Sequence, residues 1–172
     1  MNMEALGSID LLLLDVDGVL TDGSIIYDDR GIQIKAFSTK DGLGIRLLME
    51  SGVGVGILTG RTSDALEHRC RNLGISILYQ NVTDKVDALD AVLKSTGVSY
   101  GRTAYMGDDL PDIPVMKKVG LPIAVSDAHD EVKKAAKIIT QKTGGHGAVR
   151  EIADAVLKAK NLWPDILKRF SL

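Results

Sequence analysis

Short apolar runs alternate with amphipathic segments along the whole chain. The first run, Leu11–Leu14, consists only of branched aliphatic residues and predicts a short strand buried on both faces. Similar runs predict strands at Val53–Leu58, Ile75–Tyr79, Thr103–Met106, Ile123–Val125 and Ile138–Thr140. Segments with helical spacing separate these runs. This repeated alternation of strand and helix predicts an α/β fold, a doubly wound, Rossmann-like parallel sheet.

The helical segments carry start and stop signals of their own. Ser63 is a good N-cap for a helix over Asp64–Leu73, and Gly74 ends that helix. Thr83 is expected to cap a helix that runs through Lys94. Further helices are expected over Leu43–Glu50, Ile113–Val119, Glu131–Lys137 and Ala148–Lys160.

Two segments depart from this alternation. Ser24–Tyr27 and Gln33–Phe37 surround the polar stretch Asp28–Gly31, which predicts a protruding hairpin with a four-residue turn. Near the end of the chain, apolar side chains at helical spacing predict a short helix that docks on the core, or else on a partner subunit: Trp163, Ile166, Leu167 and Phe170. With no linker or repeat in the sequence, we expect one domain over residues 1–172, with the hairpin at 24–37 and a C-terminal helix and tail at 148–172.

Composition places the chain among soluble globular proteins. It has 172 residues, of which 45% are hydrophobic and 26% charged, so it can bury a core of ordinary size. The net charge of −2 does not indicate a nucleic-acid partner. The single cysteine, Cys70, excludes an internal disulfide and fits a reducing compartment. The N-terminus lacks a basic region and a long apolar segment, so we expect a cytoplasmic protein with no signal peptide and no membrane span.

Polar groups follow four of the predicted strands, and the carboxyl ends of parallel strands meet at one edge of a sheet. Asp15 and Asp17 directly follow the first strand, and two carboxylates placed together repel each other unless a cation or a proton lies between them. The later strands add a hydroxyl, a lysine and a further acidic cluster: Thr59, Lys85, Asp108, Asp109 and Asp112. This set of groups suits phosphoryl transfer.

Each of these motifs alone has a simpler interpretation. The DxDG stretch from Asp15 could form a turn, Thr59 could cap a turn, and Lys85 could be a solvated residue at a helix start. The acidic cluster at Asp108–Asp112 could cap the helix that follows it. The motifs occur in one order, each after a strand, which favours a shared site.

These motifs resemble those of the haloacid dehalogenase superfamily of phosphotransferases. The resemblance implies that Asp15 is a nucleophile that forms an aspartyl-phosphate, and that Asp17 protonates the leaving alcohol and then activates water. It implies that Thr59 and Lys85 hold the phosphoryl oxygens.

The same resemblance implies a magnesium site. Asp15, Asp108 and the backbone carbonyl of Asp17 would bind Mg²⁺, since this ion prefers oxygen ligands. Asp109 and Asp112 would orient the groups around it.

Longer stretches resemble a narrower family, the capless, homotetrameric 3-deoxy-D-manno-octulosonate 8-phosphate phosphatases of lipopolysaccharide biosynthesis. The stretches are Ser38–Gly42, Leu58–Arg61, Tyr105–Asp112 and Gly144–Glu151. Arginines suit a sugar acid because a guanidinium binds carboxylates with a planar fork. The resemblance implies substrate contacts by Asp17, Ser38, Thr39, Lys40, Asp41, Gly42, Arg46, Gly60, Arg61, Arg69 and Lys85.

The chain has no room for a cap domain. Between Asp22 and Leu43 only the hairpin fits, and between Gly74 and Tyr105 only one strand and one helix fit. We therefore expect a homo-oligomer, a tetramer by resemblance, in which hairpins pair edge to edge and a neighbouring subunit covers the site. We expect no nucleic-acid or membrane partner.

Departures from the family pattern leave alternatives open. Asn81 stands where glycine is expected in the loop before Lys85, and His146 stands where arginine is common. A nine-carbon, sialic-type sugar-acid 9-phosphate is therefore a second candidate substrate.

Two other classes of protein are alternatives for this sequence pattern. A signalling receiver would carry an aspartate after a middle strand, where this chain has Thr59. A non-catalytic assembly subunit is the remaining class, and the intact motifs argue against it.

Overall fold

The computed structural model describes residues 3–171. Its main sheet has the order β5-β4-β1-β6-β7-β8, and every neighbouring pair is parallel. The strands are β1 Leu11–Leu14, β4 Gly54–Leu58, β5 Ile77–Tyr79, β6 Thr103–Gly107, β7 Leu121–Ala124 and β8 Ile138–Ile139. Numbered along the chain, this is the 3-2-1-4-5-6 order of doubly wound sheets, so the predicted fold class is confirmed. A receiver would have the order 2-1-3-4-5, which excludes that class.

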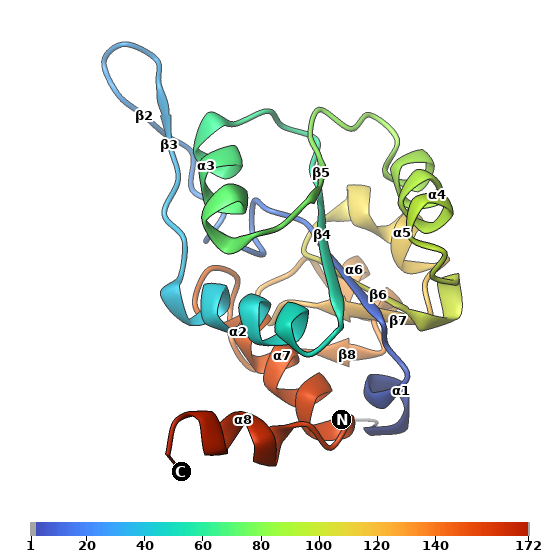
Figure 1. The fold of residues 1–172 in the computed structure, drawn as a ribbon. Helices are drawn as coiled ribbons and strands as arrows, with labels where there is room; N and C mark the ends of the chain where they lie inside the picture. Colours follow the sequence, from blue (N-terminus) through green and yellow to red (C-terminus); the bar gives the residue numbers. More distant parts are fainter. Residues whose placement is uncertain (1–2, 172) are drawn as a thin grey trace.

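Helices cover both faces of this sheet (Figure 1). One face carries α1 Met3–Gly7, α2 Thr39–Glu50, α3 Asp64–Leu73 and α7 Ala148–Ala159. The other carries α4 Lys85–Thr96, α5 Ile113–Met116 and α6 Asp130–Ala135. The last helix, α8 Trp163–Arg169, packs on α7 as the apolar spacing of the tail predicted. Between the layers β1 is at most 1% exposed, and burying each of its leucines contributes about 1.5–3 kcal/mol.

Two helix starts differ from the sequence-based expectation. Helix α2 begins at Thr39, because the Ser38 side chain accepts a hydrogen bond from the Asp41 amide. The sequence predicts a later start at Leu43, since Gly42 and Gly44 are poor helix formers. The expected cap at Thr83 is wrong: Asp84 caps α4, its Oδ1 accepting from the Val86 amide at 2.7 Å. A carboxylate at this position also interacts favourably with the helix dipole.

The hairpin stands clear of the body at the upper left of Figure 1. Its strands, β2 Ile26–Tyr27 and β3 Gln33–Ile34, are shorter than predicted. The Asp28 carboxylate accepts the amides of Arg30 and Ile32, which opens the turn into a wider loop. No cap domain is present within residues 3–171, and no helix there is both long and apolar enough to cross a membrane.

Candidate active site

A cleft of about 860 Å³ opens at the carboxyl ends of β1, β4 and β6. Every catalytic and metal-binding residue expected from the sequence lines it, together with the glycine and arginine that follow Thr59. These residues are Asp15, Asp17, Thr59, Gly60, Arg61, Lys85, Asp108, Asp109 and Asp112. The sheet topology therefore gathers side chains that lie far apart in the sequence.

Lys85 lies at the centre of the charged groups. Its Nζ is 2.9 Å from Asp15 Oδ1, 2.7 Å from Asp112 Oδ1 and 3.3 Å from the Tyr105 hydroxyl oxygen. Burial alone would lower the pKa of Lys85, but Asp15 and Asp112 raise it above its ordinary value. The ammonium therefore stays charged and can hold an anionic phosphoryl group.

Carboxylate oxygens of Asp15, Asp108 and Asp112 lie within 4.8 Å of one another. Burial, and then the charge of Asp112, raises the pKa of Asp15 to about 6. Burial, and then the charges of Asp15 and Asp112, raises the pKa of Asp108 to about 8. Among the described residues, Asp108 Oδ1 is buried and has no hydrogen-bond partner. A hard divalent cation such as Mg²⁺ fits this set of oxygens, because it would satisfy that atom and relieve the repulsion.

Asp112 orients other groups, because both of its oxygens already accept hydrogen bonds. Oδ1 accepts from Lys85 and from the Tyr105 hydroxyl at 2.6 Å, while Oδ2 accepts from the amides of Asp108 at 2.9 Å and Asp109 at 3.2 Å. Asp109 in turn caps a short 3-10 helix over Leu110–Asp112 through its own carboxylate. The contacts of Asp112 are compatible with the orienting role expected for it, while the role of Asp109 stays a prediction.

The hairpin reaches the cleft through residues that were not among the predicted site residues. The Lys35 ammonium donates to Asp17 Oδ1, and the Lys35 side chain is only 2% exposed. On the other side of the same carboxylate, Arg61 Nε lies 3.8 Å from Asp17 Oδ2, while Arg61 Nη2 donates to the Tyr27 hydroxyl. The alternating pattern around Gln33 was the available signal, since it places Lys35 on the same face of the strand.

Thr59 is buried, and its hydroxyl oxygen accepts the Arg61 amide at 3.4 Å. Its backbone amide donates to the Tyr79 carbonyl, so only the hydroxyl is left to face the cleft. In the loop that follows, Asn81 has a φ of 54°, the left-handed region that glycine adopts most easily. This backbone conformation explains why glycine is the expected residue there.

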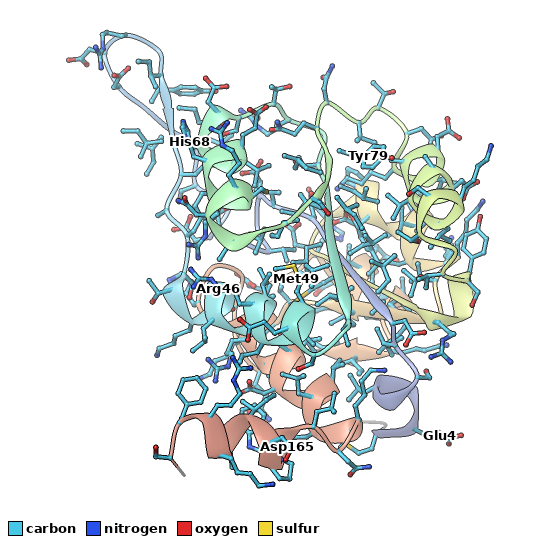
Figure 2. All side chains as sticks on the ribbon, in the orientation of Figure 1. Glu4, Arg46, Met49, His68, Tyr79 and Asp165 are labelled. Carbon is cyan, nitrogen blue, oxygen red and sulfur yellow. The ribbon has the colours of Figure 1, made fainter. Side chains whose placement is uncertain are left out.

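The remaining expected substrate contacts lie outside the cleft of this chain: Ser38, Thr39, Lys40, Asp41, Gly42, Arg46 and Arg69. The Asp41 carboxylate is buried and accepts the amides of Gly147 and Arg150, which joins α2 to α7. Arg69 donates to the Ser38 carbonyl and lies over the Phe37 ring. Arg46, labelled in Figure 2, lies on α2 below the hairpin. Contact between these residues and a substrate stays a prediction.

Comparison with known proteins gives consistent matches. Residues 75–152 match the haloacid dehalogenase-like hydrolases. The chain is 46% identical to the 3-deoxy-D-manno-octulosonate 8-phosphate phosphatase of Escherichia coli over 153 residues, 89% of this chain and 81% of that protein. The crystal structure of the Yersinia pestis enzyme superimposes with a TM-score of 0.93 at 43% identity, over 94% of this chain and 88% of that one. The structure of the Moraxella catarrhalis enzyme contains magnesium, phosphate and a KDO molecule. It superimposes with a TM-score of 0.95 at 40% identity, over 98% of this chain and 97% of that one.

Proposed function

This chain belongs to the 3-deoxy-D-manno-octulosonate 8-phosphate phosphatases of the haloacid dehalogenase-like hydrolases, and from that premise we propose its reaction. It is a magnesium-dependent phosphatase that removes the phosphate from 3-deoxy-D-manno-octulosonate 8-phosphate in lipopolysaccharide sugar biosynthesis. One observation carries the chemistry: the Lys85 ammonium lies against Asp15 in a cleft that also holds the unpartnered oxygen of Asp108.

The reaction proceeds in two steps at Asp15. A carboxylate oxygen of Asp15 attacks phosphorus, the bond from phosphorus to the sugar oxygen breaks, and Asp17 gives that oxygen a proton. Water then attacks the phosphorus of the aspartyl-phosphate and loses a proton to Asp17, which releases phosphate and restores the Asp15 carboxylate. Lys85 and Thr59 hold the phosphoryl oxygens in both steps.

Asp15, Asp108 and the backbone carbonyl of Asp17 would hold the metal. When bound, Mg²⁺ supplies positive charge that offsets the repulsion between a phosphate dianion and the Asp15 carboxylate. Asp112 keeps the backbone at Asp108 in place, because its Oδ2 accepts a hydrogen bond from the Asp108 amide.

Recognition of the sugar acid rests first on Arg61, which lines the cleft and whose side chain is 43% exposed. The other expected contacts, Ser38–Gly42, Arg46 and Arg69, would complete a site between subunits of a homotetramer. Exposed apolar side chains on the hairpin support such an assembly, since an isolated protein rarely leaves them to water: Ile25, Ile26, Ile32 and Ile34. We place this one-domain enzyme in the cytoplasm, in keeping with its single cysteine.

The test is phosphate release from a panel of sugar phosphates with Mg²⁺, including 3-deoxy-D-manno-octulosonate 8-phosphate and a sialic-type nine-carbon 9-phosphate. We expect a strong preference for the eight-carbon acid and loss of turnover by at least about 10³-fold in Asp15→Asn. Preference for the nine-carbon acid would keep the mechanism and change the substrate. No release from any substrate by folded protein would contradict the proposal and favour an assembly subunit.

A further inference from the structure

Tyr105 lies beneath the active site with no exposed surface. It belongs to β6, opposite Leu13 of β1, and is the largest fully buried side chain in the described part of the chain. An apolar core needs only the ring, and a buried hydroxyl is costly unless it finds a partner. The partner here is Asp112, whose Oδ1 accepts the Tyr105 hydroxyl at 2.6 Å.

The contacts of Lys85 give this hydroxyl a function. An ammonium has three N–H donors, and Lys85 donates two of them, to Asp112 Oδ1 and to the Tyr105 hydroxyl oxygen, while it forms an ion pair with Asp15. The hydroxyl therefore contacts both Asp112 and Lys85. Because two donors of Lys85 have acceptors in fixed directions, the ammonium is held in place, and its third N–H can donate to a phosphoryl oxygen.

Gly107 supplies the space that this arrangement needs. A Cβ on Gly107 would lie 2.5 Å from the Cβ, Cγ and Oδ2 atoms of Asp112, so only glycine lets that carboxylate lie against β6. Tyr105 and Gly107 are two residues apart on one strand and face the same side. Strand β6 thus contacts Asp112 at two positions: Tyr105 donates a hydrogen bond to its carboxylate, and Gly107 leaves room for its side chain.

We propose that Tyr105 is a positioning residue of the active site, which fixes the Lys85 ammonium through Asp112. It does not touch the substrate. Its effect reaches the reaction because Lys85 orients Asp15 and holds the phosphoryl oxygens, and small displacements of reacting groups lower the rate strongly. The inference rests on the proposed phosphoryl transfer at Asp15.

The experiment measures kcat and KM of Tyr105→Phe at saturating Mg²⁺, on 3-deoxy-D-manno-octulosonate 8-phosphate and on p-nitrophenyl phosphate. Loss of one hydrogen bond to a charged group predicts a kcat about tenfold lower on both, with KM within about twofold of the parent. Tyr100→Phe is the matched control, because it removes an exposed tyrosine hydroxyl that donates to Asp90 at 2.5 Å. We expect the control to keep the parent kcat.

Tyr105→Met separates packing from positioning. It removes ring and hydroxyl together, so positioning predicts a kcat loss in the folded protein at least as large as that of Tyr105→Phe, besides a lower melting temperature. A parental kcat in Tyr105→Phe, or failure of that variant to fold, would overturn the inference. If the parent protein hydrolyses neither substrate, the proposed function is wrong instead. If it hydrolyses only p-nitrophenyl phosphate, the proposed sugar substrate is wrong, and the comparison of Tyr105→Phe with the parent can still be made on p-nitrophenyl phosphate.

Discussion

Lys35 holds Asp17 from the base of the hairpin, with its ammonium donating to Asp17 Oδ1 and its side chain almost wholly buried. The hairpin stands clear of the body in Figure 1, yet this ion pair joins it to Asp17, for which we propose the proton transfers of the reaction. The protruding element is therefore part of the active site as well as a surface.

Lys35→Met tests the ion pair between Lys35 and Asp17, because methionine keeps much of the aliphatic side chain and removes the charge. Without the ammonium, Asp17 loses the donor that fixes its orientation, and we expect kcat/KM to fall by about tenfold or more. Steady-state kinetics on the sugar phosphate measures the change. Lys134→Met is the control, since Lys134 pairs with Glu131 on the surface of α6. A Lys35→Met enzyme as fast as this control would contradict the prediction.

Magnesium should stabilise the protein more as the pH rises. The folded-state pKa values of about 6 for Asp15 and about 8 for Asp108 both exceed the ordinary value of 3.8. In metal-free protein these two groups therefore contribute stability that is full below pH ~4 and is lost as the pH rises through about 6 and then about 8. Metal binding requires the deprotonated forms, so Mg²⁺ gains affinity over the same range.

Thermal melts with and without Mg²⁺ at pH ~6 and pH ~9 measure this difference. We expect a clearly larger rise in melting temperature at the higher pH. Asp108→Asn should lose most of that dependence, because the amide does not titrate and is a weaker ligand. An equal effect of Mg²⁺ at both pH values would show that these carboxylates do not control metal binding.

Much of this fold could be predicted because its signals are local. The apolar run of β1 and the caps at Ser63 and Gly74 depend on neighbours in sequence, and the structure has them where expected. The start of α2 could not be predicted, since helix propensity disfavours Gly42 and Gly44 and contacts with α7 decide the outcome. The start of α4 was missed for a local reason, since Thr83 and Asp84 are both good N-caps and only Asp84 is used.

The active site divides in the same way. Asp15 and Lys85 could be found because each follows a strand, and sheet topology alone brings them together. Lys35 and Tyr105 escaped notice, because one reads as an exposed hairpin residue and the other as core. The alternation around Gln33 gives the face on which Lys35 lies, but the contacts of Lys35 with Asp17 and of Tyr105 with Asp112 depend on the tertiary structure.

The exposed isoleucines of the hairpin should govern assembly. Ile26 and Ile34 form a cross-strand pair, 46% and 51% exposed, so a lysine at Ile26 places a charge on this apolar face. We expect Ile26→Lys to lower the oligomeric state seen by analytical ultracentrifugation. Ile139→Lys is the matched control, an isoleucine 48% exposed on β8. An unchanged mass for Ile26→Lys would remove the hairpin from the interface.

The glycine-rich loop before α7 packs against the loop that follows Asp15. A Cβ on Gly144 would lie 1.7 Å from the Gly18 carbonyl oxygen and 3.1 Å from that of Thr21, and backbone atoms cannot move aside cheaply. Gly145 fixes the contact further, since its amide donates to the Val19 carbonyl at 2.9 Å. Gly144→Ala must therefore displace one loop or the other.

We expect Gly144→Ala to lower the free energy of unfolding by about 1–3 kcal/mol, the usual cost of overpacking. The displaced loop also carries the backbone next to Asp17, so kcat should fall in the protein that remains folded. Urea unfolding and steady-state kinetics measure the two effects. Gly101→Ala is the control, because a Cβ there meets nothing within 4 Å. If both variants unfold at the same urea concentration, the two loops are not rigidly packed against each other.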